Sequence, residues 1–250
     1  MTTELMLHIK NSDGRTVLED CYFTSPLKIG TPNNEGERLA LVLMMASAGV
    51  LKGDRFSYDI MCAAMSETTI TDQSYTKIFN TGEGDASKEM KIQVQAGASL
   101  YYHPSAVIPF AGSSYKSDMQ VHLAAESEFA YADILAAGRV GMGERFAFRR
   151  YHSRVCVSIE DSPVWVDNCL LEPGRMELDS LFFFNGSTHQ GTFYYYGPED
   201  KMEMLSQFTT EAPVLYGISR AAQGVCVRVL AESAQDIEEV FDEMGGKLHL

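Results

Sequence analysis

The sequence lacks the signals of several common protein classes. Its cysteines are few and scattered, with no C-x-x-C pair, so neither a disulfide framework nor a Cys-rich zinc site is expected; they are Cys21, Cys62, Cys156, Cys169 and Cys226. No apolar run approaches the roughly 20 residues that a membrane-spanning helix requires. The start Thr2-Thr3-Glu4 has no basic-then-apolar leader. These absences predict a cytoplasmic protein with reduced cysteines.

Positive charge is also scarce. Against 34 Asp and Glu residues the chain has 20 Lys and Arg, which gives a net charge of −14. Binding to nucleic acid or to an anionic membrane depends largely on Lys and Arg, so both partners are disfavoured. An acidic protein suits a metal cation or a basic protein partner, although acidity also serves solubility alone.

No catalytic motif is complete. The six histidines show no H-x-x-x-H or H-E-x-x-H spacing, and G-x-S-x-G is missing. Gly138 and Gly143 have the spacing of a phosphate-binding loop, but Glu144 and Arg145 stand where that loop needs Lys and Ser or Thr. The glycines are therefore expected to form a tight turn in which Glu144 pairs with Arg139 or Arg145. The alternative, an acid–base pair of Asp133 and Glu144, stays open because sequence separation says nothing about distance.

What is present is β-structure. Apolar residues alternate with polar ones around residues 92–94, 121–123, 155–159, 192–196 and 225–230. Turn signals such as Asn11-Ser12-Asp13-Gly14 and Glu172-Pro173-Gly174 separate these runs. No linker or low-complexity tract divides the chain. The pattern predicts a mainly β, stacked-sheet architecture in a single domain over residues 1–250.

About two short helices are expected. Ser233 with Asp236 resembles a capping box, Ile237, Val240, Phe241 and Met244 follow at helical spacing, and Gly245 is the expected stop. A shorter helix is expected within residues 199–208. The apolar run 35–46 fits either a helix or a buried strand, because periodicity does not separate the two.

Five blocks, read in order, resemble the urease accessory protein D family, which is called H in some bacteria. They are Thr24 to Lys28, Ser47 to Arg55, Thr69 to Phe79, Gly97 to Phe110, and Gly138 to Phe146. Three positions depart from the family pattern. Ala48 replaces a common Gly, and a left-handed backbone there would strain it. Tyr101 replaces a usual acidic residue, and Asp72 stands where Thr or Ser is usual, so the acidic residues are rearranged relative to the family pattern.

The resemblance implies a solenoid-like β fold and a maturation factor that is not an enzyme. Family members are expected to bind the F accessory protein, which recruits the nickel-carrying G protein, and to dock this assembly on apo-urease, with homodimerisation within the complex as an option. Nickel is expected to pass through a tunnel in the scaffold, as a transient Ni²⁺ and not as a permanent cofactor. Scattered carboxylates hold such a cation weakly enough to release it.

The resemblance supplies the candidate residues. Asp54, Asp72, Asp133 and Glu144 are the predicted tunnel carboxylates. The predicted structural residues of the motif are Gly49, Gly53, Gly138, Arg139 and Gly143.

A second hypothesis assigns partner contact to Ile237, Val240 and Phe241 on the C-terminal helix; the simpler reading is that this stripe packs on the body of the protein. Two other function classes stay open from the residues alone: a β-sheet module that binds carbohydrate or protein, and a glycoside hydrolase.

Overall fold

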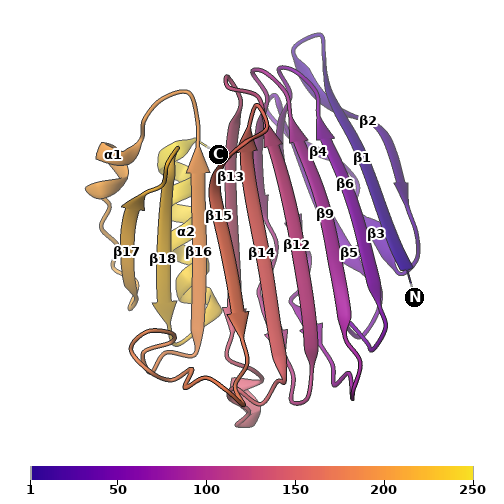
Figure 1. The fold of residues 1–250 in the computed structure, drawn as a ribbon. Helices are drawn as coiled ribbons and strands as arrows, with labels where there is room; N and C mark the ends of the chain where they lie inside the picture. Colours follow the sequence, from indigo (N-terminus) through magenta and orange to yellow (C-terminus); the bar gives the residue numbers. More distant parts are fainter. Residues whose placement is uncertain (1, 250) are drawn as a thin grey trace.

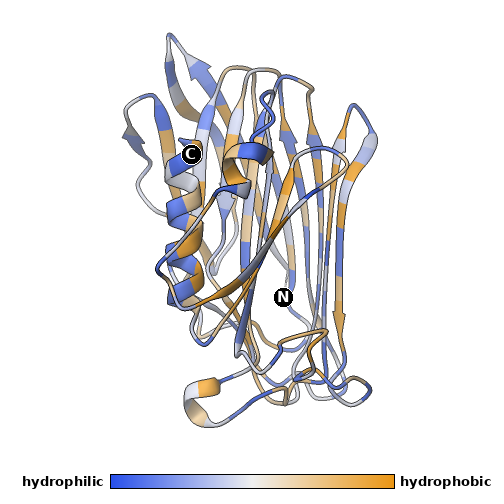
Figure 2. Ribbon diagram, turned by 90° about the vertical axis from the view of Figure 1, so that its left-hand side faces the viewer, coloured by the Kyte–Doolittle hydropathy of each residue, from blue (hydrophilic) through white to orange (hydrophobic). Residues whose placement is uncertain are grey.

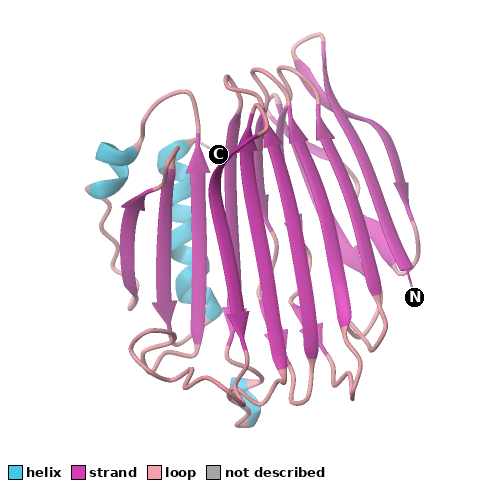
Figure 3. Cartoon of the chain, viewed as in Figure 1, coloured by secondary structure: helices cyan, strands magenta, loops and turns pink. Residues whose placement is uncertain are grey.

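The protein consists of two facing β-sheets (Figures 1 and 3), in a computed structural model that describes residues 2–249. The first sheet has the order β15-β14-β12-β9-β6-β1-β2. Its strands are β1 (Thr2–Ser12), β2 (Arg15–Phe23), β6 (Arg55–Cys62), β9 (Ala86–Val94), β12 (Ser114–Leu123), β14 (Arg150–Ile159) and β15 (Ser162–Leu171).

The second sheet has the main order β17-β18-β16-β13-β10-β7-β5-β3, with β4, β8 and β11 beside this path. Its strands are β3 (Leu27–Ile29), β4 (Asn33–Glu35), β5 (Arg38–Met45), β7 (Glu67–Asp72), β8 (Thr76–Ile78), β10 (Ser99–His103), β11 (Val107–Pro109), β13 (Glu128–Ala136), β16 (His189–Tyr196), β17 (Leu215–Arg220) and β18 (Val225–Ala231).

The chain crosses repeatedly from one sheet to the other, which makes the fold solenoid-like. From β5 to β14 its main strands alternate between the sheets, and β6, β9, β12 and β14 pair in parallel, as do β5, β7, β10 and β13. Antiparallel pairing is found toward the ends of the sheets. In the first sheet β1 pairs with β2 and β14 pairs with β15, and in the second sheet β18 pairs with β16 on one side and with β17 on the other. The predicted mainly β, stacked-sheet fold is confirmed.

The core lies between the sheets because alternate residues of each strand point inward. On β9, for example, Met90, Ile92 and Val94 are buried while Lys91 and Gln93 are exposed. The same alternation appears along the strands in Figure 2 as successive orange and blue segments. The predicted strand runs at 92–94, 121–123, 155–159, 192–196 and 225–230 all lie in strands.

Helix α2 (Ala234–Leu248) covers the outer face of the second sheet over β13, β16 and β18 (Figure 1). Ser233 caps it as predicted, since its Oγ accepts a hydrogen bond from the Asp236 N–H at 3.1 Å. The predicted stop at Gly245 is wrong: the helix continues through Gly245 and ends at His249 in the left-handed conformation. The buried helix face tolerates glycine because packing, and not propensity, holds it there.

Two further sequence expectations are resolved. The ambiguous run 35–46 forms strand β5, whose residues Leu39, Leu41 and Leu43 face the core. The shorter helix is α1 (Met202–Ser206), and a 3₁₀ turn, η1 (Val140–Met142), lies in the glycine loop. Within residues 2–249, no helix combines the length and the apolar character needed to cross a membrane.

Candidate functional site: a polar cavity between the sheets

A row of polar residues crosses the inner face of the first sheet. The strand register aligns Lys88 of β9 with Ser117 of β12, Ser117 with Ser153 of β14, and Ser153 with Cys169 of β15. Lys88 is in phase with the inward residues Met90 and Ile92, so the alternation of the strand turns its side chain inward. A charged group therefore stands in this polar row, within an inner face that is mostly apolar.

A second polar row lies on the inner face of the second sheet. Asp133 of β13 pairs with Thr192 of β16, and Thr192 pairs with Arg228 of β18. Asp72 ends β7 on the same inner face, and its carboxylate accepts a hydrogen bond from the Ser105 N–H. Two of the four predicted carboxylates, Asp72 and Asp133, are thus brought to one space between the sheets.

That space is a cavity of about 150 Å³. Asp72, Asp133 and Lys88 line it together with Ser117 and Ser153. Five tyrosines also line it: Tyr58, Tyr102, Tyr115, Tyr131 and Tyr151. Exposed lining residues, among them Ser47, Ser74 and Tyr75, lie on the loops at one side. The volume is enough for several water molecules or a hydrated ion.

Lys88 is the enclosed cation of this cavity. Its Nζ lies 3.2 Å from the Tyr102 hydroxyl, to which it donates, and 4.4 Å from the centre of the Tyr58 ring. Asp72 and Lys88 attract each other across the cavity, but the ion pairs found among residues 2–249 include none between them. Burial lowers the pKa of Lys88, and the charge of Asp72 partly opposes this change.

Asp133 leads from the cavity toward a second charged group. Arg228 Nη1 donates to Thr192 Oγ1 at 2.6 Å, and the Thr192 and Tyr131 hydroxyls donate to the Asp133 carboxylate. Arg228 Nη2 lies 2.8 Å from Asp167 Oδ1, and the Arg228 side chain is 52% exposed. A chain of polar contacts therefore runs from Asp133 at the cavity wall through Thr192 to Arg228, whose side chain reaches solvent, and to its partner Asp167.

The environment keeps these carboxylates harder to ionise than in water. Burial, and after it the charge of Asp167, raises the pKa of Asp133 to about 6. Burial also raises the pKa of Asp72, while Lys88 acts in the opposite direction. Burial keeps the cavity tyrosines in the neutral phenol form by raising their pKa. The cavity can therefore offer two weakly basic carboxylates and several hydroxyl oxygens to a cation.

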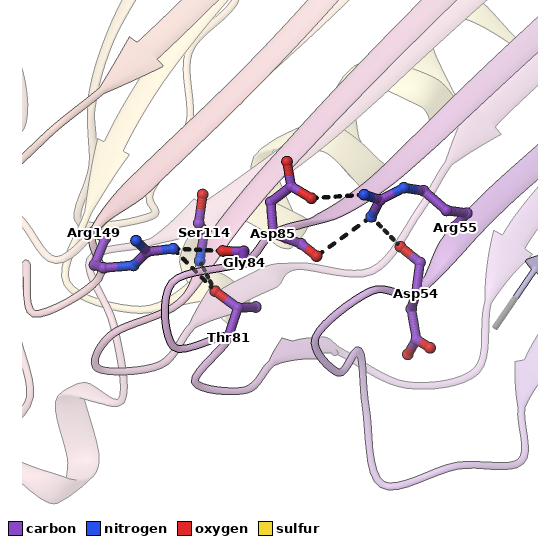
Figure 4. A network of polar contacts seen from close by, with 7 residues as sticks. All are labelled: Asp54, Arg55, Thr81, Gly84, Asp85, Ser114 and Arg149. Atoms are coloured by element: carbon purple, nitrogen blue, oxygen red, sulfur yellow. Dashed lines mark hydrogen bonds and ion pairs between the residues drawn. The ribbon is translucent and has the colours of Figure 1, made fainter.

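Asp54 and Glu144 do not line this cavity. Asp54 closes a turn, because its Oδ2 accepts the Leu51 N–H at 2.8 Å. In Figure 4 the carboxylate of Asp54 points away from the neighbouring polar network. In that network Arg55 donates hydrogen bonds to the backbone carbonyl of Asp54 and to the carboxylate of Asp85. Arg149 donates to the Gly84 carbonyl and ties a neighbouring loop into the same network. These contacts hold the loops at one end of the strands together.

Glu144 forms the predicted ion pair with Arg139. Arg139 Nε donates to Glu144 Oε2 at 2.8 Å, and the Ala111 N–H donates to the same oxygen at 3.2 Å. The bond to Arg139 is the main cause that lowers the pKa of Glu144. Asp133 lines the cavity, whereas Glu144 is held outside it by Arg139 and the Ala111 N–H, so the two belong to separate sites and not to one acid–base pair.

The motif glycines serve turns and close backbone approach. A Cβ on Gly49 would lie 2.4 Å from the Lys77 carbonyl oxygen, and one on Gly138 would lie 2.9 Å from that of Glu144. Gly53 and Gly143 adopt left-handed φ values of 81° and 74°. Ala48 is not among the described residues with positive φ, so the strain considered for it does not arise.

The residues assigned to partner contact lie at 0% exposure. Ile237, Val240 and Phe241 fill the layer between α2 and the second sheet, with Phe241 5.7 Å from the ring of Phe193. A partner would reach them only after α2 moved off the sheet. Their role in partner binding stays a prediction.

Sequence reasoning missed Lys88, Asp167 and Arg228. The alternation of β9 could have identified Lys88, because it is in phase with the apolar residues Met90, Ile92 and Val94. A charged side chain on a buried face is rare unless it is paired, so it marks a candidate functional residue. Asp167 and Arg228 gave no such signal, since their proximity depends on strands that are far apart in the chain. Within the described part of the chain, no group of three or more His, Cys, Asp or Glu residues is arranged to hold a metal ion.

Comparison with known proteins agrees with the resemblance seen in the sequence. The family model described as UreD urease accessory protein matches residues 1–248. A urease accessory protein UreD of Acetivibrio thermocellus is 34% identical over 246 residues, which cover 96% of this chain and 94% of the relative. A urease accessory protein UreH of Helicobacter pylori strain G27 is 31% identical over 229 residues, covering 90% and 86%.

Proposed function

The chain belongs to the UreD family of urease accessory proteins and supports urease maturation, and we propose that it acts as a non-catalytic scaffold that passes nickel toward the urease active site. The observation that carries this proposal is the cavity between the sheets that Asp72 and Asp133 both line. Two carboxylates from different strands form a path for a divalent cation, in which each step binds weakly.

The proposed route begins among the exposed loops at Ser47 and Tyr75, passes Asp72 and Asp133, and leaves toward Asp167. Hydroxyl and carboxylate oxygens line it, and such oxygen donors suit Ni²⁺ less well than imidazole does, so they favour transient binding of the ion. Ni²⁺ is the cargo on this route and not a resident cofactor. The ion pair of Asp167 with Arg228 then marks the exit, where a positive charge favours onward release of the ion.

The scaffold role requires partners. We propose that the chain binds the F accessory protein, that this protein recruits the nickel-carrying G protein, and that the assembly docks on apo-urease. Membership in a family of urease accessory proteins supports contact with urease and with other accessory proteins. Co-purification of the tagged chain with the F and G proteins and with apo-urease tests this part, and failure to recover any of them would contradict it.

The nickel route is tested by urease activation in cells that carry single alanine variants of the four predicted carboxylates. Asp72→Ala and Asp133→Ala are expected to lower activation at normal levels of the variant protein. Asp54→Ala and Glu144→Ala are the matched comparison, because these carboxylates lie in turns outside the cavity. Full activation by both cavity variants would contradict the route.

A further inference from the structure

The cavity holds an unusual feature for a cation path, namely a lysine. Lys88 and Asp72 both keep accessible surface, although protein surrounds them, because that surface lines the cavity. Of the lining residues, the other cation is Lys77, which is exposed to solvent on β8. Lys88 is therefore the positive charge that an entering metal ion meets inside.

The contacts of Lys88 fix its ammonium between the two sheets. It reaches from β9 in the first sheet to the Tyr102 hydroxyl on β10 in the second, at 3.2 Å, and it lies over the Tyr58 ring at 4.4 Å. A tyrosine ring face attracts a cation. Thus three groups hold the ammonium in place: a hydroxyl, a ring face and the negative field of Asp72.

A metal ion and this ammonium require the same surroundings. Both are attracted by Asp72 and by the oxygens around it, and they repel each other strongly where protein replaces water. Among the ion pairs found within residues 2–249 none joins Lys88 to Asp72, so a withdrawing Lys88 gives up its hydrogen bond to Tyr102 and its contact with the Tyr58 ring but no direct salt bridge.

We propose that Lys88 is an internal competitor for the metal: its ammonium occupies a cation position in the cavity between Tyr58 and Tyr102, within the field of Asp72, when the path is empty, and a divalent cation binds near Asp72 only as Lys88 gives way. Lys88 thereby sets the affinity of this step and favours release of the ion. This inference rests on the proposed nickel route through the cavity.

The test measures Ni²⁺ binding by the full-length chain, by competition with a chromophoric chelator. Lys88→Met removes the charge and keeps most of the side-chain volume, so it is expected to tighten binding roughly tenfold or more. Lys88→Arg retains the charge and is expected to stay within about twofold of the parent protein. Lys91→Met is the matched control, because Lys91 lies on the same strand but faces solvent.

A second readout separates competition from a merely structural role. If Lys88 competes with the metal, Ni²⁺ raises the Tm of Lys88→Met more than it raises the Tm of the parent protein. Adding Asp72→Asn to Lys88→Met is expected to abolish the larger Ni²⁺-induced rise in Tm. Lys88→Gln replaces the Met variant if the latter does not fold.

The outcomes distinguish the two proposals. If Asp72→Asn and Asp133→Asn leave Ni²⁺ affinity unchanged, or if the parent chain binds no Ni²⁺, the nickel route itself is overturned and the competitor role with it. If both carboxylate variants weaken binding but Lys88→Met binds no more tightly than the parent protein, only the competitor role is overturned.

Discussion

At the scale of single residues, the molecule separates carboxylates that hold turns from carboxylates that face the cavity. Asp54 and Glu144 accept backbone N–H groups and belong to loops. Asp72 and Asp133 are enclosed between the sheets, where burial raises the pKa of each. All four were predicted as tunnel carboxylates from the sequence, and their surroundings in the fold distinguish them.

Asp133 gives a prediction for stability against pH. Its folded pKa of about 6 lies above its ordinary value of 3.8, so between these values the folded protein binds more protons than the unfolded chain. The Asp133 contribution to stability is therefore present at low pH and is lost as pH rises through 6, by up to about 3 kcal/mol. The free energy of unfolding in urea, measured from pH 4 to 7, is expected to fall in this way for the parent protein. In Asp133→Asn this fall with pH is expected to be absent.

The matched control for that experiment is Asp161→Asn, whose parent side chain is 98% exposed. This variant is expected to keep the pH dependence of the parent protein. An unchanged pH dependence in Asp133→Asn as well would show that the buried carboxylate is not the group responsible.

Gly49 supplies a second prediction at this scale. An alanine there would place its Cβ 2.4 Å from the Lys77 carbonyl oxygen, at a φ of 151°. Gly49→Ala is expected to lower the free energy of unfolding by about 3 kcal/mol. Gly53→Ala adds only the strain of a positive φ, since its Cβ would meet no atom within 4 Å, and is expected to cost about 1 kcal/mol. Equal losses in the two variants would contradict the close-approach argument.

At the scale of elements, period-2 alternation predicted the strands, and the cap at Ser233 predicted the start of α2. Three features of the structure could not be predicted from the sequence, because local pattern does not determine them. Strand β5 carries an apolar run that fits a helix equally well, and Gly245 lies inside α2 because tertiary packing overrides its helix-breaking tendency. The placement of Asp72 and Asp133 on one cavity depends on the stacking of strands that are distant in sequence.

Helix α2 supplies the prediction for an element. Phe241 is fully buried against β16 and lies 5.7 Å from Phe193, so Phe241→Ala is expected to cost about 3–5 kcal/mol in thermal or urea unfolding. Glu239→Ala, on the exposed face of the same helix, is expected to change stability by less than about 0.5 kcal/mol. A Phe241→Ala protein as stable as the Glu239→Ala protein would show that α2 does not depend on this packing.

The same helix allows a test of the partner hypothesis for Ile237, Val240 and Phe241. A chain that ends after Ala231 loses α2 and uncovers the apolar outer face of β13, β16 and β18. If these residues bind the partner, the shortened chain is expected to lose the F protein in co-purification. A shortened chain that stays stable and still binds the F protein would remove the hypothesis.

At the scale of the whole molecule, two sheets enclose a polar path within an apolar core. Two successive crossings of the chain between the sheets add one main strand to each sheet, and the strand register aligns the inward polar residues into two facing rows. Burying Lys88, Asp72 and Asp133 carries a cost in desolvation, and stability alone gives no reason for it. The nickel route that we propose offers a reason for that arrangement.

The most direct test of this account is the nickel content of urease purified from cells that carry the Asp72→Ala, Asp133→Ala double variant. We expect the double variant to co-purify with its partners while the urease contains far less nickel than in cells with the parent protein. The matched Asp54→Ala, Glu144→Ala double variant is expected to leave the nickel content close to that of the parent. Fully loaded urease in the presence of the cavity variant would contradict the account.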